Sequence, residues 1–203
     1  MIDKYDLFSQ IFKIGMVDME ALENLINRTS SRFLSEPVPD QNELEKIYQI
    51  ALRAPDHAGL KPTRFIQISG EGLDRLSSVF EEYAKKNIKD ISDEKLEKYK
   101  SAPFRAPMII VLVSQIKEHK SVPEIEQIIS TGTSAHGILL ALNAMNYSGI
   151  WRTGIFAFNQ KVAELMGLKE NEKIIGYLYV GTPTNSPKEL DPVDTADYVT
   201  NWA

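Results

Sequence analysis

The chain has 203 residues, of which 43% are hydrophobic and 25% are charged, a composition typical of one globular domain rather than a disordered chain. Its net charge of −5 argues against a nucleic-acid-binding protein, which would carry a basic excess or patch. It contains no cysteine, so disulfides, thiolate catalysis and cysteine-rich zinc sites are excluded.

Neither a secretion signal nor a membrane-spanning segment is recognisable in the sequence. Residues 1–17 include acidic side chains and lack the uninterrupted apolar core of a signal peptide. The longest apolar run, residues 108–113, is far too short to cross a bilayer. The sequence therefore predicts a soluble, cytoplasmic protein that has neither a membrane nor a nucleic acid as a partner.

Two helices are predicted near the N-terminus. Asp18 can cap a helix that runs to Arg28, because apolar residues recur there at helical spacing. Asp40, followed three residues later by Glu43, forms a capping box for a second helix, which Pro55 ends. Residues 1–17 are expected to be an amphipathic extension, and residues 18–203 a single domain.

The rest of the chain mixes strands with helices. Strands are predicted at residues 64–69, 108–114 and 174–181, and the middle one is apolar on both faces, as a central strand would be. Helices are predicted over residues 73–83, 123–146 and 159–167, with a charged helix ending near Lys100, a loop or short strand at residues 149–154, and an extended proline-rich arm from residue 182. Regular alternation of strand and helix is absent, so the predicted fold class is α+β.

The helix predicted over residues 123–146 carries Gly132, Ser134 and Gly137. These small residues indicate close packing against another element, either in the same subunit or in a second one. His136 lies among apolar residues of this helix and is expected to be a hydrogen-bonded core residue.

The segment RTSSRF, residues 28–33, combines two arginines with three hydroxyl side chains directly after the first helix. A guanidinium group can bind an anion through a bidentate fork, and neighbouring hydroxyls add donors. An arginine at a helix C-terminus can also simply complement the helix dipole, and position alone favours this interpretation for Arg28. Arg32 is assigned a structural role.

Two further clusters bring cations together with aromatic or imidazole rings. Arg53 and His57 flank Pro55, and Trp151-Arg152-Thr153 lies near two glycines. The tryptophan–arginine pair suits stacking and anion contact as well as it suits a packed tryptophan beside a solvent-exposed arginine. The histidines lack metal-ligand spacing, so no metal site is predicted. The Gly-x-Gly-x-x-Gly loop and the Walker lysine motif are absent, so any nucleotide must be bound in another way.

Taken together, in order and spacing, these segments resemble the nitroreductase family, and specifically its small YdjA-like branch. The resemblance rests on INRTSSRF, ALRAPDHAGLKP and GIWRTG, with APFRAPMIIVLV and IIGYLYVGTP matching the family's middle and late strands. It extends from about residue 19 to residue 183. It implies a nitroreductase-like fold, with a central, mainly antiparallel sheet flanked by helices and a C-terminal arm exchanged in a homodimer.

The resemblance also implies flavin mononucleotide (FMN), bound between the two subunits, and NADH or NADPH as electron donor. The matching positions form three groups: Arg28, Thr29 and Ser30 near the phosphate and ribityl chain; Arg53 and His57, contributed by the partner subunit; and Trp151, Arg152 and Thr153. No catalytic side chain is assigned, because the flavin itself carries out hydride transfer.

This chain departs from the family pattern at two places. Thr29 stands where an arginine is usual, and Lys61-Pro62-Thr63-Arg64 replaces the customary Gln-Pro-Trp pattern, which removes an aromatic ring and adds two cations. The implied function is that of an FMN-dependent NAD(P)H oxidoreductase, which reduces nitroaromatic or other electron-poor small molecules in ping-pong half-reactions. Two alternatives stay open: a flavin-binding protein without turnover, for storage or regulation, and a helical interaction module without a cofactor.

Overall fold

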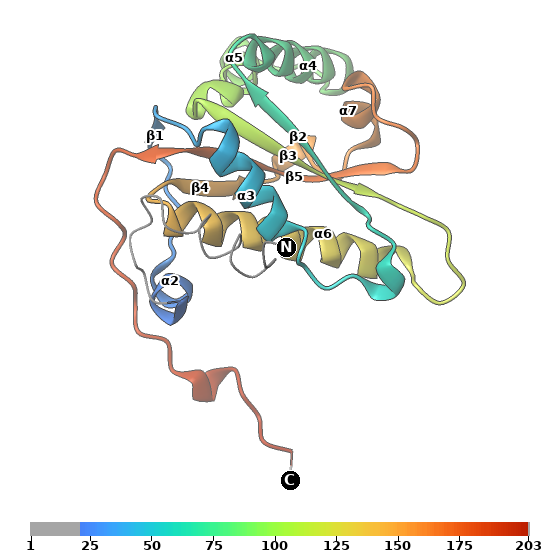
Figure 1. The fold of residues 1–203 in the computed structure, drawn as a ribbon. Helices are drawn as coiled ribbons and strands as arrows, with labels where there is room; N and C mark the ends of the chain where they lie inside the picture. The colour runs from blue at the N-terminus through green and yellow to red at the C-terminus, as the bar shows by residue number, and fades with distance from the viewer. Residues whose placement is uncertain (1–20, 203) are drawn as a thin grey trace, which may run out of the picture.

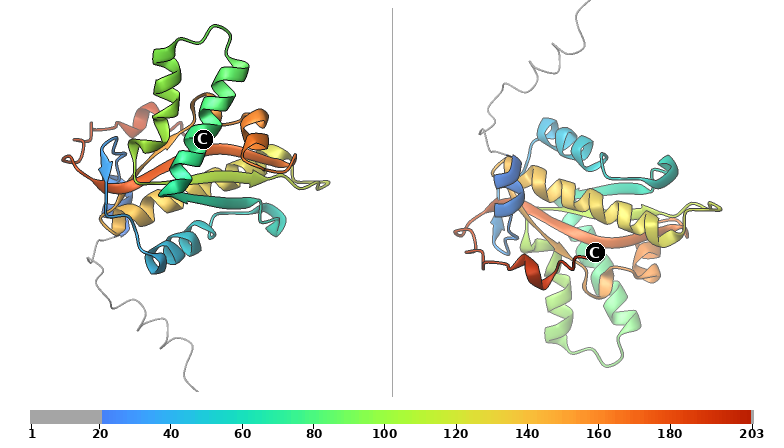
Figure 2. Two further views of the ribbon diagram at one scale, coloured as in Figure 1. Left: turned by 90° about the horizontal axis from the view of Figure 1, so that it is seen from above. Right: turned by 90° about the horizontal axis from the view of Figure 1, so that it is seen from below.

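The structure is a computed structural model that describes residues 21–202, so the predicted extension and the predicted helix start at Asp18 lie outside the described residues. The described part of the chain is built around a five-stranded antiparallel sheet with helices on both faces (Figures 1 and 2). This arrangement confirms the predicted α+β class and the antiparallel sheet flanked by helices.

The sheet is organised around its two longest strands, β3 (Met108–Gln115) and β5 (Glu172–Pro183), which pair with each other. β2 (Thr63–Ser69) pairs with the other edge of β3. β4 (Ser148–Arg152) and the short β1 (Leu34–Ser35) pair with successive parts of β5. The first seven residues of β3 are buried, which confirms its prediction as a central strand.

Two helices, α3 (Gln41–Ala51) and α6 (Glu124–Ala144), cover one face of the sheet. The predicted capping box begins α3: an Asp40 carboxylate oxygen accepts the N–H of Glu43 at 2.9 Å, and a Glu43 carboxylate oxygen accepts the N–H of Asp40 at 2.8 Å. The buried side chains of this layer include Leu44, Ile47, Ile110, Leu112, Ile138, Leu142 and Leu178. Burying each of these contributes about 1.5–3 kcal/mol.

The opposite face is covered by α4 (Glu71–Asn87), α5 (Asp93–Lys100) and α7 (Gln160–Leu165), in the regions where helices are predicted. Phe80 of α4 stacks on Phe156 with ring centroids 3.7 Å apart, and Tyr177 of β5 meets Phe80 edge-on. The buried Tyr177 hydroxyl donates to the Phe156 carbonyl at 3.1 Å, and burial raises the pKa of Tyr177. Aromatic packing therefore joins α4 to β5 at this end of the sheet.

The small residues of α6 pack within the subunit. A Cβ at Gly137 would lie 3.3 Å from Ala51 Cα of α3, and one at Gly132 would lie 3.5 Å from the Trp151 ring. The prediction that His136 is a core residue is wrong, because it lies on the outer face of α6 and is exposed. The same outer face exposes Ile125 and Ile129, at 58% and 59%.

α2 (Ala21–Asn27) packs on the C-terminal half of α6 through polar contacts. The Asn24 side chain donates to the Leu140 carbonyl at 3.1 Å and accepts from Asn143 Nδ2 at 2.7 Å. No side chain of α2 is buried, and Leu22 and Ile26 are 71% and 69% exposed. The apolar stripe that predicted this helix therefore faces outward in the single subunit.

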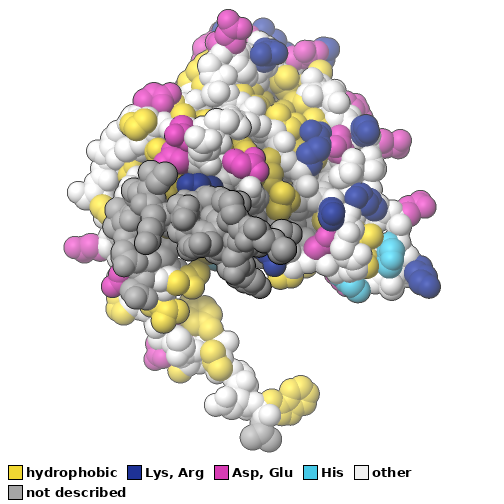
Figure 3. Space-filling model, viewed as in Figure 1, with side chains coloured by type: hydrophobic (Ala, Val, Ile, Leu, Met, Phe, Trp, Pro, Cys, Tyr) yellow, Lys and Arg dark blue, Asp and Glu magenta, His cyan; other side chains and the backbone are white. Residues whose placement is uncertain are grey.

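The chain after β5 forms the extended arm that its prolines predict (Figure 1). It leaves the body of the molecule, contains one short 3-10 turn, η4 (Thr195–Asp197), and exposes apolar side chains along its length (Figure 3). Trp202 is fully exposed. Exchange of this arm between subunits stays a prediction.

Candidate functional site

The first predicted segment, Arg28-Thr29-Ser30, directly follows α2. Thr29 and Ser30 line a cavity of about 620 Å³, whose other walls come from the end of α6, the start of β4 and the beginning of the C-terminal arm. The neighbouring Ser31 hydroxyl lies 3.0 Å from both the Phe33 carbonyl and the Asn185 side-chain oxygen, which ties this segment to the arm. The segment and the arm thus form one polar cavity.

In the second segment, consecutive side chains of β4 point to opposite faces of the sheet, as in any strand. Trp151 packs toward α6, in the core layer of Leu178, whereas Arg152 faces the layer that holds Tyr177 and Tyr179. Gly176 of β5 makes room for the indole, because a Cβ there would lie 1.9 Å from Trp151 Nε1. The Trp151 side chain is therefore a packed wedge between β5 and α6, and it is separated from the Arg152 guanidinium by the sheet.

Arg152 borders an aromatic cavity of about 350 Å³, which is lined by Tyr99, Phe156, Tyr177 and Tyr179 among others. Its guanidinium carbon lies 5.4 Å from the centre of the Tyr179 ring, a cation–π distance. Burial lowers the pKa of Arg152, and the positive charges of Arg105 and Arg32 lower it further.

Arg32 and Arg105 are additions to the predicted site. Both act electrostatically on Arg152, and Arg105 also lines the same aromatic cavity. Within residues 21–202, no carboxylate forms an ion pair with either of them or with Arg28 or Arg152. The position of Arg32 four residues after Arg28 was a usable signal in the sequence, whereas nothing in the sequence around Arg105 marked it.

Unsatisfied donors coincide with three of the predicted residues. Among the described residues, four buried side-chain atoms have no hydrogen-bond partner: Arg28 Nη1, Ser114 Oγ, Trp151 Nε1 and Arg152 Nε. Trp151 Nε1 faces the backbone of Gly176 and is part of the packing described above. Because leaving a buried donor unpaired costs about 1–3 kcal/mol, the guanidinium donors of Arg28 and Arg152 indicate places where a bound group with acceptor oxygens would fit.

The third group, Arg53 and His57, lies in the loop between α3 and β2, which contains the 3-10 turn η1 (His57–Gly59). His57 Nδ1 lies 2.6 Å from a carboxylate oxygen of Glu126, in the first turn of α6. Both Arg53 and His57 are exposed. His57 therefore lies beside the N-terminal end of α6, whereas the Arg28 segment lies beside its C-terminal half.

The Arg28 segment and His57 are attached to different parts of α6 in one subunit. The Arg28 segment is attached to α6 through Asn24 and Asn143, whereas His57 is attached through Glu126. These positions on α6 are about 25 Å apart at 1.5 Å per residue. The Arg28 segment and His57 are therefore attached near opposite ends of α6.

Comparison with known proteins agrees with the fold. The model of the Nitroreductase family matches residues 25–182. The chain belongs to the nitroreductase family. It is 40% identical over 184 residues to the Escherichia coli K12 protein "Putative NAD(P)H nitroreductase YdjA", a match that covers 90% of this chain and 99% of that protein. A Haemophilus influenzae protein of the same general description is 33% identical over the same shares of the two chains.

Solved structures of the nitroreductase fold also superpose on this family member. The nitroreductase-like family protein from Bacillus cereus gives a TM-score of 0.78 at 18% identity, covering 93% of this chain and 98% of the other. The FMN and NADPH-dependent nitroreductase NfnB from Sphigopyxis sp. strain HMH gives 0.70 at 15% identity, covering 91% of this chain and all of the other. At these identities the likeness shows the fold.

Residues 21–202 contain no group of three or more His, Cys, Asp or Glu side chains placed to hold a metal ion. None of the helices in that part of the chain combines the length and the apolarity needed to cross a membrane.

Proposed function

We propose that this nitroreductase-family protein is an FMN-dependent NAD(P)H oxidoreductase, which reduces nitroaromatic or other electron-poor small molecules. The observation that carries the proposal is the pair of buried guanidinium donors, on Arg28 and Arg152, that have no partner among residues 21–202. Both belong to segments in which the family resemblance places flavin contacts. FMN supplies a doubly charged phosphate and acceptor oxygens, which are the groups that these donors lack.

The residues on this side of the molecule suit an anionic aromatic cofactor. Arg28, Thr29 and Ser30 would hold the phosphate and ribityl chain, and Arg152 with Thr153 would lie along the ring system. The aromatic cavity beside Arg152 and the positive charges of Arg32 and Arg105 favour a planar group that becomes more negative on reduction.

A complete site requires two subunits in this proposal. Two α6 helices that pair antiparallel about a two-fold axis would bring the His57 end of one subunit to the Arg28 end of the other. The exposed Ile125 and Ile129 of α6 and the exposed Leu22 and Ile26 of α2 would be covered in such a dimer. Arg53 and His57 would then contact the partner's cofactor.

We assign no catalytic side chain. When bound, the flavin would accept a hydride from the nicotinamide and deliver electrons to the acceptor in a second half-reaction. The protein's own residues would bind and orient the cofactor, supply positive charge beside it and exclude water from its enclosed face.

An anaerobic reduction experiment tests this function. The purified protein, reconstituted with FMN, should show flavin absorbance, and NADH or NADPH should bleach it within seconds to minutes. Reoxidation by a nitroaromatic compound should then restore the absorbance. A protein that stays colourless after reconstitution contradicts the proposal, and stable colour without bleaching would identify a flavin-binding protein without turnover.

A further inference from the structure

The loop between α3 and β2 has a backbone conformation that needs support. Ala58, Gly59 and Lys61 have φ angles of 60°, 62° and 50°. Residues with a Cβ rarely adopt this left-handed region, because Cβ meets the backbone there. Ala58 and Lys61 therefore keep these angles only because surrounding contacts hold the loop.

Two oppositely charged side chains form hydrogen bonds with the backbone of Leu60 and Lys61. The Asp56 carboxylate accepts the N–H groups of Leu60 and Lys61 at 3.1 and 2.7 Å. From the other side, Lys117 Nζ donates to the Leu60 and Lys61 carbonyls at 2.5 and 3.4 Å. The position of the Lys61 Cα is thus fixed by four hydrogen bonds.

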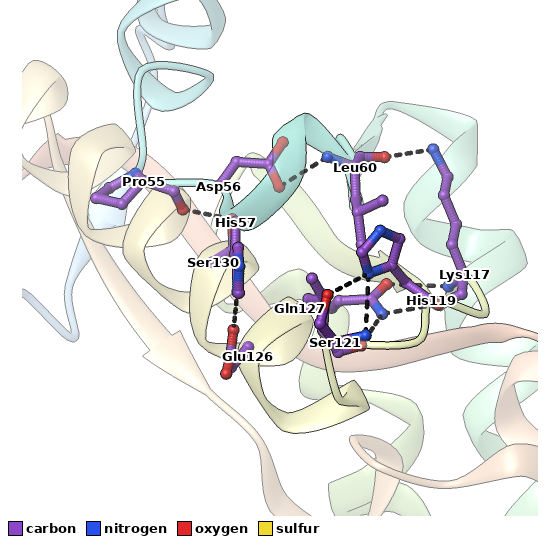
Figure 4. A network of polar contacts seen from close by, with 11 residues as sticks. Pro55, Asp56, His57, Leu60, Lys117, His119, Ser121, Glu126, Gln127 and Ser130 are labelled. Atoms are coloured by element: carbon purple, nitrogen blue, oxygen red, sulfur yellow. Dashed lines mark hydrogen bonds and ion pairs between the residues drawn. The ribbon is translucent and has the colours of Figure 1, made fainter.

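The first turns of α6 anchor this arrangement (Figure 4). Gln127, which is 2% exposed, accepts the N–H of Lys117 and donates to its carbonyl, both at 2.9 Å. The Ser130 hydroxyl donates to the Pro55 carbonyl at 2.8 Å, and Glu126 holds His57. One rigid helix therefore supports the loop at three points.

The Lys61 side chain carries its charge at the surface of the loop. Lys61 is exposed and forms no ion pair with any carboxylate in residues 21–202. The nearby carboxylates have other partners: Asp56 binds the loop backbone, Glu126 binds His57, and Glu124 binds Lys173. Basic side chains (Lys or Arg) and histidines lie near one another at the lower right of the view in Figure 3, with a few acidic side chains among them.

We propose that Lys61 is a specificity-determining residue that receives the anionic group of a molecule entering the site. This inference rests on the proposed function, because the loop that carries His57 would then lie over the partner's flavin. The group is a carboxylate or a phosphate. Its source is either an acidic acceptor, such as a nitroaromatic acid, or the 2′-phosphate of NADPH. The hydrogen bonds of the loop fix the backbone of Lys61 before the ligand arrives, which lowers the cost of bringing its ammonium group to an anion.

Steady-state kinetics on the FMN-loaded protein test this. For the acceptor, kcat/KM is measured with 4-nitrobenzoate and with the neutral 4-nitrobenzamide; for the donor, it is measured with NADPH and with NADH. Two ratios of kcat/KM are compared: that for the anionic over the neutral acceptor, and that for NADPH over NADH. Lys61→Gln should lower one of these ratios by about three- to tenfold. The matched control Lys120→Gln, at an exposed lysine of the neighbouring β3–α6 loop, should leave both ratios unchanged.

The ratio that falls identifies the source of the anion, and either fall supports the inference. Two unchanged ratios in Lys61→Gln, with the parent active, would contradict the role of Lys61 and leave the proposed function intact. A parent that is reduced by neither nicotinamide contradicts both.

A second variant separates positioning from charge. Asp56→Ala removes a negative charge near Lys61, so electrostatics alone would make anions bind better. If the hydrogen-bonded conformation of the loop is required for anion binding, Asp56→Ala should instead lower the same kcat/KM ratio as Lys61→Gln. The flavin spectrum and the circular dichroism spectrum should stay those of the parent. A raised ratio would contradict the positioning argument.

Discussion

Arg28 and Arg152 are each half-buried, and each has a guanidinium donor without a partner in the described part of the chain. This environment distinguishes them from ordinary surface arginines. The charges of Arg32 and Arg105 add to that of Arg152, so the unliganded site holds repelling cations. An anion between them would relieve both the repulsion and the missing hydrogen bonds. At this scale the sequence predicted the residue types, but it could not show which arginines are unpaired, because pairing depends on the folded neighbours.

Arg28→Ala should weaken FMN binding about 10- to 100-fold, because it removes a charge-assisted contact of about 1.5–3 kcal/mol. The melting temperature of the flavin-free protein should change little, since no internal hydrogen bond of that guanidinium is lost. Equilibrium dialysis with FMN measures the effect. Arg75→Ala, at an exposed arginine of α4, is the control and should bind FMN like the parent. Equal affinities in all three proteins would remove Arg28 from the site.

The surroundings of Glu172 predict that part of the free energy of unfolding depends on pH. Its carboxylate is 3% exposed and accepts hydrogen bonds from Arg64 Nε at 2.7 Å and from the Lys169 N–H at 2.9 Å. Burial alone would raise its pKa, but these hydrogen bonds and the charges of Arg64 and Lys169 leave it below the ordinary value. A lowered folded-state pKa contributes stability above the unfolded value of about 4.3, and this stability is lost as the pH falls through the folded pKa.

Glu172→Gln should therefore reduce the free energy of unfolding by about 1–3 kcal/mol at pH 7. The difference from the parent should shrink as the pH falls from about 5 to 3. Urea unfolding at several pH values measures it, with the exposed Glu170→Gln as control. A deficit that does not change with pH would show that the carboxylate is not stabilised by its neighbours.

Helices and strands whose sequence patterns lie in consecutive residues were predicted well. Strands that form only by pairing with a segment distant in the sequence were not. The capping box of α3 and the apolar run of β3 can each be recognised within a short, continuous stretch of sequence. By contrast, β1 is two residues long and exists only because it pairs with the end of β5, and residues 148–152 are a strand because β5 lies beside them. The apolar spacing of α6 predicted a helix, but only the packed structure shows that the face carrying His136 points away from the sheet.

The wedge of Trp151 between β5 and α6 depends on Gly176. Gly176→Ala places a Cβ 1.9 Å from Trp151 Nε1, so either the indole or β5 must shift. We expect a loss of about 1–3 kcal/mol in the free energy of unfolding, as for other overpacked cores. Adding Trp151→Ala in the same chain should make the Gly176→Ala step much less costly, because the two residues are in contact.

Gly132→Ala is the matched control for this wedge. Its new Cβ would lie 3.5 Å from the other side of the same indole, an ordinary contact distance. Alanine is also favoured over glycine in a helix by up to about 1 kcal/mol. Urea unfolding should find this variant at least as stable as the parent. If Gly176→Ala were equally stable, the indole would not be fixed against β5.

For the whole molecule, we propose that the flavin site is assembled from two subunits. The sequence could indicate its parts through resemblance, but not their separation, because the distance between Arg28 and His57 is set by the length of α6. In one subunit these groups attach near opposite ends of that helix, through Asn143 and Glu126. The exposed apolar residues of α2, α6 and the C-terminal arm are consistent with a surface that a second copy covers.

Complementation between two defective subunits tests this claim most directly. A heterodimer of Arg28→Ala and His57→Ala subunits, purified through two different tags, would contain one site with both lesions and one with neither. It should recover about half of the parent's NAD(P)H-dependent nitroreductase activity. A heterodimer of Arg28→Ala and Arg152→Ala subunits is the control, and it should recover none, because both residues belong to the same half of the site. The shared site would be contradicted if the activity of the first heterodimer were no higher than the mean of its two homodimers. It would also be contradicted if light scattering showed a flavin-loaded monomer.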